Sequence, residues 1–168
     1  MTISMYQVAV PVFVRMLQNL TTIIEKGAAH AEAKKIDPLV LINSRLYPDM
    51  LPLSKQVQIA TDMAKGCVAR LAGLEPLKFD DNEASFPDLL ARIRKTIDYL
   101  NTFSKAQIDG TEEKSITLQM RTGPLTFVGM QYLLNFAQPN FYFHITTAHD
   151  ILRHCGVEVG KWDFLGKS

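Results

Sequence analysis

The sequence predicts an all-α fold, an up-and-down four-helix bundle with a short extended arm before the last helix. Apolar residues recur at i, i+3, i+4 and i+7 in four long stretches, which is the pattern of buried helix faces. The stretches are joined by short connections, and neither a repeat nor a low-complexity run divides the 168 residues. With 47% hydrophobic and 21% charged residues, the chain has the balance of one domain with a sizeable core. We therefore expect residues 1–168 to form a single helical-bundle domain.

The first predicted helix runs from Ser4 to about Lys34. Pro11 falls inside it and removes a backbone donor, so we expect a kink or a helix start near that residue. The second predicted helix covers residues 53–71. Gly73 is well placed to end it, because glycine accepts the left-handed conformation of a C-cap.

The third predicted helix begins after the acidic loop at residues 79–88. Ser85 and Asp88 have the spacing of a capping box, and an apolar stripe then continues to Phe103. Residues 115–123 alternate between apolar and polar side chains, which predicts a short strand or an extended arm. Apolar density returns at Thr126, so we expect a fourth helix from there to Cys155, broken or kinked at Pro139.

The C-terminal segment 156–168 lacks helical periodicity, yet Trp162, Phe164 and Leu165 are too apolar to be left in water. We expect it to be ordered and to pack back on the bundle. The sequence leaves open whether it caps the end of the bundle, fills the pocket or reaches a partner subunit.

The charge balance excludes some classes of partner. Eighteen Lys and Arg residues face seventeen Asp and Glu residues, so the excess of basic charge that binds a phosphate backbone is absent and no nucleic-acid partner is expected. No run of about 18 apolar residues predicts a membrane span, and the N-terminal residues lack the features of a signal peptide. Cys67 and Cys155 form no disulfide framework, so we expect a cytoplasmic protein with free thiols.

Three histidines, His144, His149 and His154, lie in the predicted fourth helix. His144 and His149 diverge by about 140° around the axis, so they cannot share one ion. Asn140 and His144 are spaced i, i+4 on one face beside the apolar stripe, and this pair can point into the bundle. Asparagine is a poor ligand for zinc or nickel, so a metal would need donors from another helix. The alternative is that His144 is a partly buried histidine with a structural partner.

Residues 47–62 (YPDMLPLSKQVQIATD), residues 139–166 (PNFYFHITTAHDILRHCGVEVGKWDFLG) and the long opening helix together resemble one family. It is a bacterial family of unknown function within the DinB/YfiT-like superfamily of metalloenzymes, and the resemblance spans nearly the whole chain. The resemblance implies a helical bundle, often a homodimer. It also implies a zinc or nickel site with one histidine on the second helix and an HxxxH pair on the fourth. Gln56 and Asn140 stand where two of these ligands are expected, and only His144 matches.

The degenerate ligand set leads to two hypotheses of function. In the first, no cofactor is bound, and Met50, Gln56, Asn140 and His144 form a pocket for an unknown small molecule. In the second, the protein is a divalent-metal-dependent transferase, acting on thiols, or a hydrolase. His144 then supplies one ligand to zinc or nickel, and Asp49, Asp62 or another histidine completes the set.

A structural homodimer without a ligand is a third reading. Tyr142, His149 and Trp162 are its candidate interface residues, because large amphipathic side chains are enriched at interfaces.

Overall fold

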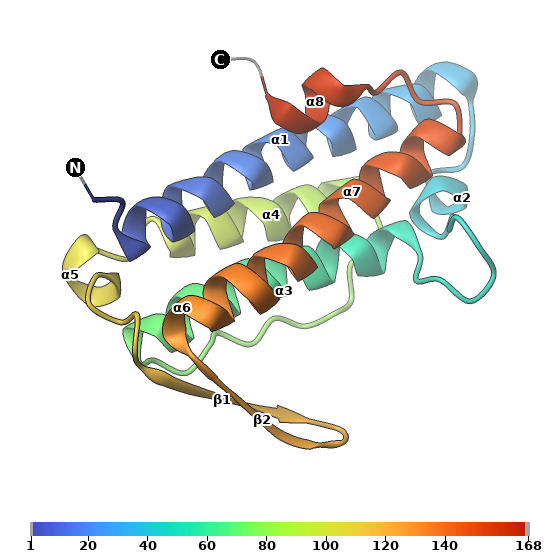
Figure 1. Cartoon of the computed structure of the whole chain (residues 1–168). Helices are drawn as coiled ribbons and strands as arrows, with labels where there is room; N and C mark the ends of the chain where they lie inside the picture. Colours follow the sequence, from blue (N-terminus) through green and yellow to red (C-terminus); the bar gives the residue numbers. More distant parts are fainter. Residues whose placement is uncertain (1, 167–168) are drawn as a thin grey trace.

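The computed structural model describes residues 2–166, and four long helices dominate it (Figure 1). These helices are α1 (Met5–Lys34), α3 (Leu53–Ala72), α4 (Phe86–Leu100) and α7 (Gln138–His154). They lie side by side, with α3 packed against both α7 and α4, and α1 packed against α4. The mostly helical class expected from the apolar periodicity is confirmed.

Shorter elements lie between the long helices, and one, α8 (Lys161–Leu165), follows the last of them. The elements in between are α2 (Pro38–Ile42), α5 (Lys105–Ile108), β1 (Ser115–Met120), β2 (Gly123–Val128), α6 (Gly129–Gln131) and the π-helix η1 (Tyr132–Ala137).

The helix ends follow the capping chemistry of the sequence. Ser4 caps α1, since its hydroxyl accepts from the amide of Gln7 while the Gln7 side chain accepts from the amide of Ser4. Helix α1 therefore begins before Pro11 and runs through it, so the alternative of a helix start at Pro11 is wrong. Gly73, at φ +78°, ends α3 in the left-handed conformation as expected. Ser85 caps α4 by accepting from the amide of Asp88.

Helices α3 and α4 run in the same direction, so the strict up-and-down order expected from the sequence does not hold for this pair (Figure 1). Gln58, near the start of α3, bonds Glu83 just before α4, and Asp62 one turn later bonds Arg92 of α4. The connecting segment 73–85 can span about 40 Å when extended. That reach exceeds the about 30 Å length of a 20-residue helix, so the chain can return along α3 before α4 begins.

The expected extended arm is one half of an antiparallel hairpin. Strand β1 pairs with β2, with Met120 opposite Gly123 at the turn, and the hairpin projects from the end of the helices (Figure 1). The following helix therefore starts at Gly129 rather than at Thr126. It is not broken at Pro139, because η1 leads directly into α7, and the irregularity expected there takes the form of the π-helical turns just before the proline.

The core runs between the four long helices. Its fully buried side chains come from every one of them and include Phe13, Leu17, Val57, Ala64, Leu89, Ile93, Phe141 and Ile145. The rings of Phe13 and Phe141 meet edge to face at 4.8 Å between centroids. Helix α1 is long and apolar enough to cross a membrane by length and composition alone, a test that core helices also pass. In this structure 44% of its most apolar 18-residue stretch is buried.

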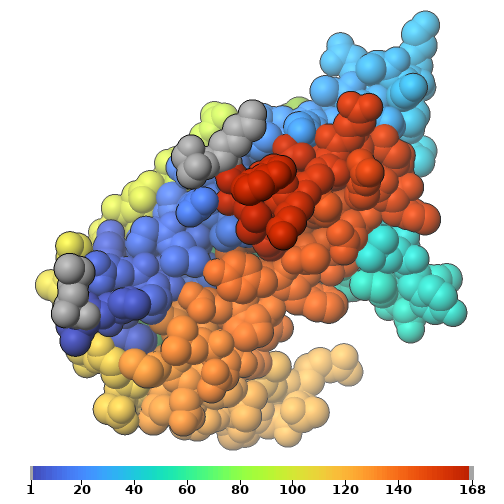
Figure 2. Space-filling view, turned by 45° about the horizontal axis from the view of Figure 1, so that its top comes forward, coloured from blue at the N-terminus to red at the C-terminus, as the bar shows by residue number. Residues whose placement is uncertain are grey.

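The described part of the C-terminal segment, up to Gly166, packs along α1, as expected (Figure 2). It is helical at α8, which the sequence pattern did not indicate (Figure 1). Asp163 accepts from Lys26 at 2.6 Å, and Asn19 donates to the carbonyl of Phe164 at 2.9 Å. A short helix held by side chains of α1 needs no periodic apolar stripe of its own, which is why hydrophobic periodicity missed it.

Candidate functional site

His144 on α7 and Gln56 on α3 form a polar pair between the two most closely packed helices. The Nδ1 atom of His144 lies 2.7 Å from Oε1 of Gln56. Gln56 is buried, whereas His144 is half-buried and so keeps one side accessible. The structure therefore brings together two of the residues that the family resemblance placed at one site.

The hydrogen bonds fix the tautomer of His144. Nε2 of Gln56 donates to the carbonyl of Leu51 at 2.9 Å, so the amide oxygen of Gln56 must face the imidazole. Nδ1 of His144 then carries the proton and donates, and Nε2 keeps a lone pair. Burial lowers the pKa of His144 below its ordinary value of 6.5, so the ring is neutral at pH 7. His144 is thus prepared as a hydrogen-bond acceptor at Nε2.

Met50 and Asn140 contribute less directly. Met50 lies in the loop before α3, next to Leu51 whose carbonyl holds Gln56, and its side chain is half-buried. Asn140 lies one turn before His144, but its amide nitrogen donates to the carbonyl of Phe136 in η1 at 2.7 Å. Asn140 therefore stabilises the end of the π-helix, and membership of Met50 and Asn140 in one pocket with His144 stays a prediction.

The residues around His144 do not fit a metal site of the kind the family resemblance implies. Gln56 uses its oxygen on His144 itself, and within residues 2–166 no three His, Cys, Asp or Glu side chains are grouped so that they could hold an ion. Asp62, a candidate to complete the ligand set, instead accepts from Arg92 at 2.7 Å and from Lys65 at 2.9 Å. Asp49 lies in the exposed loop before α3.

The other histidine candidate on α7 is more buried than the sequence predicted. His149 keeps 14% of its side-chain surface exposed, and its Nδ1 lies 2.9 Å from Asp150. Tyr142 is half-buried and Trp162 is exposed, and the homodimer interface expected at Tyr142, His149 and Trp162 stays a prediction. Cys67 is fully buried, and this burial raises the pKa of its thiol far above the usual range, as expected for a core cysteine.

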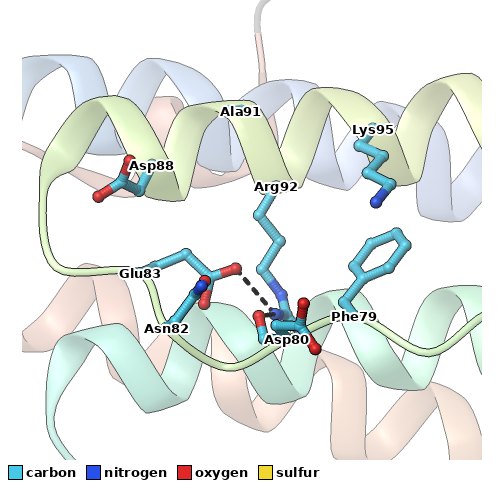
Figure 3. Close-up of a pocket in the computed structure, with 8 residues that line it drawn as sticks. All are labelled: Phe79, Asp80, Asn82, Glu83, Asp88, Ala91, Arg92 and Lys95. Atoms are coloured by element: carbon cyan, nitrogen blue, oxygen red, sulfur yellow. Dashed lines mark hydrogen bonds and ion pairs between the residues drawn. The ribbon is translucent and has the colours of Figure 1, made fainter.

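A second polar cluster, which sequence reasoning missed, surrounds Arg92 (Figure 3). Only 2% of the Arg92 side chain is exposed, and its guanidinium donates to Asp62, Glu83 and the hydroxyl of Thr61 at 2.7 to 2.9 Å. It also donates to the carbonyls of Asp80 and Gln58 and lies 3.1 Å from Asp81. A cavity of about 350 Å³ lies over this cluster.

Arg92 has no donor left for a ligand, because each of its N–H groups has a partner among the described residues. The cluster joins α3, α4 and the returning segment 73–85, and the ring of Phe79 adds cation–π contacts to Arg92, Lys65 and Lys95. These contacts tie the returning segment to both helices. The sequence carried one signal for it, since Arg92 falls on the apolar stripe of α4 and an acidic loop precedes that helix.

Comparisons with known proteins agree with this architecture. The family described as Domain of unknown function (DUF1993) matches residues 5–165. Among solved structures, the chain is similar to that of a DinB family member protein from Shewanella denitrificans, with 44% sequence identity and a TM-score of 0.89 over 97% of this chain and 92% of that chain. No curated protein matches it. The chain belongs to the DUF1993 family and is DinB-like, as its motifs indicated.

Proposed function

We propose that the protein is a DinB-like four-helix bundle protein that binds a small molecule at His144, in a degenerate metal site that uses no catalytic metal. The observation that carries this proposal is the His144–Gln56 pair, at 2.7 Å. It holds a neutral imidazole between α3 and α7 with the lone pair of Nε2 unused by Gln56. A half-buried, oriented acceptor of this kind selects a ligand that donates a hydrogen bond.

Apolar surface beside this acceptor supports a ligand with an apolar body. Phe143 packs edge to face on His144, with 5.3 Å between ring centroids, and is 57% exposed. Leu51, whose carbonyl holds Gln56, also exposes much of its side chain. A molecule that covers these side chains while it donates to Nε2 would satisfy both features.

Phenol and anisole test the proposal as matched probes, because they share an aromatic ring and only phenol donates a hydrogen bond. We expect phenol to shift the His144 ring signals in a ¹H–¹³C NMR titration, and anisole to bind more weakly by about fivefold or more. With the ring signals of the adjacent Phe143 as the readout, His144→Ala should abolish the discrimination, whereas Arg94→Ala on the exposed face of α4 should leave it unchanged. Equal binding of both probes, or no shift with either, contradicts the proposal.

The alternative is a divalent-metal-dependent transferase or hydrolase with His144 as one ligand. One observation favours it. A histidine that donates its Nδ1–H to an amide oxygen and keeps the lone pair of Nε2 free is oriented like many metal ligands. The side chains beside His144 count against this alternative, because Gln56 already bonds His144 and no three His, Cys, Asp or Glu side chains are grouped to hold an ion within residues 2–166. Metal analysis of the purified protein decides the matter, since near one equivalent of zinc or nickel, lost in His144→Ala, would replace the first proposal by this one.

We further propose that the protein is a cytoplasmic homodimer, as the family resemblance and the free thiols led us to expect. Sedimentation of the full chain measures the association directly, and a monomer at micromolar concentration would contradict it.

A further inference from the structure

A groove between α1, α7 and α8 lies apart from the His144 site. Its volume is about 380 Å³, at the small end of the range for ligand sites. The lining side chains are Val12, Arg15, Met16, Tyr142, Trp162 and Leu165. Tyr142 and His144 are two residues apart on α7, so they point about 160° apart around the helix. Occupation of this groove is therefore independent of the proposed function.

The polar groups of the groove are donors. Arg15 uses one nitrogen to donate to the carbonyl of Leu165 at 3.1 Å, and its other guanidinium N–H groups have no partner within residues 2–166. Neither the indole N–H of Trp162 nor the hydroxyl of Tyr142 bonds another group in that part of the chain, and burial raises the pKa of Tyr142, which keeps it protonated. No Asp or Glu of the described chain lines the groove. Because Arg15 is the charged residue of its lining, the groove is suited to an anion.

The wall formed by α8 is held in place. Lys26 and Asp163 pair at 2.6 Å, and Asn19 donates to the carbonyl of Phe164. Gly166 has φ +77°, and a Cβ there would meet the Asn19 side chain at 2.6 Å, so the chain can pass this closely only with glycine. Trp162, 72% exposed, is thus presented on a fixed support beside the apolar side chains of α1.

We propose that this groove binds a small amphipathic carboxylate, with its anionic head on Arg15 and its apolar body against Trp162, Val12 and Met16. A guanidinium binds carboxylate through two parallel N–H donors, and apolar lining excludes water from the rest of the ligand. A fully hydrophilic anion would leave the apolar lining uncovered, and an apolar cation would meet Arg15.

Trp162 is the single tryptophan of the chain, so its fluorescence reports on this groove alone. Decanoate is the probe, and decanol and decylamine are its neutral and cationic counterparts of equal length, all kept below their micellar concentrations. We expect decanoate to shift the Trp162 emission to shorter wavelength in a saturable manner and to protect it from iodide. Decanol should bind about tenfold more weakly or worse, and decylamine more weakly still.

Two variants separate charge from packing. Arg15→Met keeps the aliphatic length and should weaken decanoate about tenfold, to the level of decanol. Val12→Glu places a carboxylate one turn from Arg15 on α1, so the two charges pair and the preference for decanoate over decylamine should be lost. Unchanged emission of each free variant shows that α8 is still docked. His144→Ala should leave decanoate binding intact, which keeps this test distinct from that of the proposed function.

Three results would overturn the proposal. Equal affinity for decanoate and decanol would show that Arg15 does not recognise the head group. No saturable shift would show that the groove is not a ligand site. A blue shift of the native chain that follows protein concentration without any ligand, together with a loss of dimer in Trp162→Ala measured by sedimentation, would assign the groove to a second copy of the chain.

Discussion

Arg92→Ala tests whether the buried ion cluster fixes the crossover between α3 and α4. The substitution removes a guanidinium of which 2% is exposed and which bonds side chains of α3 and of the returning segment 73–85. It leaves Glu83, only 9% exposed, without its cation, whereas Asp62 and Asp81 are 37% and 46% exposed and can recover water. The main cost in stability therefore comes from the buried Glu83 carboxylate, which is left without a cation.

Breaking a buried ion pair by removing one partner costs about 3–5 kcal/mol, and we expect the lower end because two of the three carboxylates are accessible. For a domain of this size, about 3 kcal/mol corresponds to a loss of about 6–12 °C in Tm. Glu83→Gln in the same background should restore part of the loss, since a neutral amide needs no cation. The coupling between positions 83 and 92 should then reach about 1 kcal/mol or more in a double-mutant cycle.

Urea unfolding of the single and double variants measures these differences. Arg94→Ala is the matched control, because it removes the same side chain from the exposed face of α4 and should change the free energy of unfolding by no more than about 0.5 kcal/mol. If Arg92→Ala and Arg94→Ala were equally mild, the cluster would not hold the crossover, and the parallel course of α3 and α4 would need another explanation.

Three further changes have separate physical causes. Gly129→Ala should destabilise by about 3 kcal/mol in urea unfolding, because its Cβ would collide with the backbone of segment 111–112, whereas Gly160→Ala meets nothing within 4 Å and should be nearly neutral. Burial lowers the pKa of His144 from 6.5, so the unfolded chain takes up a proton at higher pH than the folded protein. Stability should therefore decline as the pH falls from about 7 to 5, and a slope unchanged by His144→Phe would refute this origin. A thiol reagent should leave Cys67 unmodified until the protein unfolds and react first at the half-buried Cys155, a difference that peptide mass mapping reports.

The apolar periodicity of the sequence predicted the four long helices well, because each buries one continuous stripe. It could not predict the direction of α4, since a stripe has the same spacing read along either direction of a bundle. It also missed β2. The sequence interpretation assigned residues 126–128 of this strand to the following helix, because apolar density returns at Thr126. The hairpin depends on pairing with β1 and on Gly129 against segment 111–112, and neither is a local property.

The candidate sites show the same division between local and long-range information. His144 and Gln56 are 88 positions apart, and only the family resemblance linked them before the structure did. Arg92 and its partners on α3 are 30 or more positions apart in the sequence, so no local spacing motif predicts their contact. A charged residue on an apolar stripe was the one available sign, and it gives the position of a buried charge without its partners.

Helix α3 connects the two polar clusters, and this bears on how variants of the His144 site are interpreted. One side of α3 is tied to α4 through Asp62 and Arg92, and another to α7 through Gln56 and His144. Gln56 also holds the loop before α3 through Leu51, so Gln56→Ala removes a structural contact together with the orientation of the imidazole. His144→Ala removes the acceptor and the hydrogen bond to Gln56, but it leaves the contact between Gln56 and Leu51 in place. A loss of phenol discrimination in His144→Ala at unchanged stability therefore reports ligand recognition, whereas the same loss in Gln56→Ala combines recognition with the anchoring of the loop.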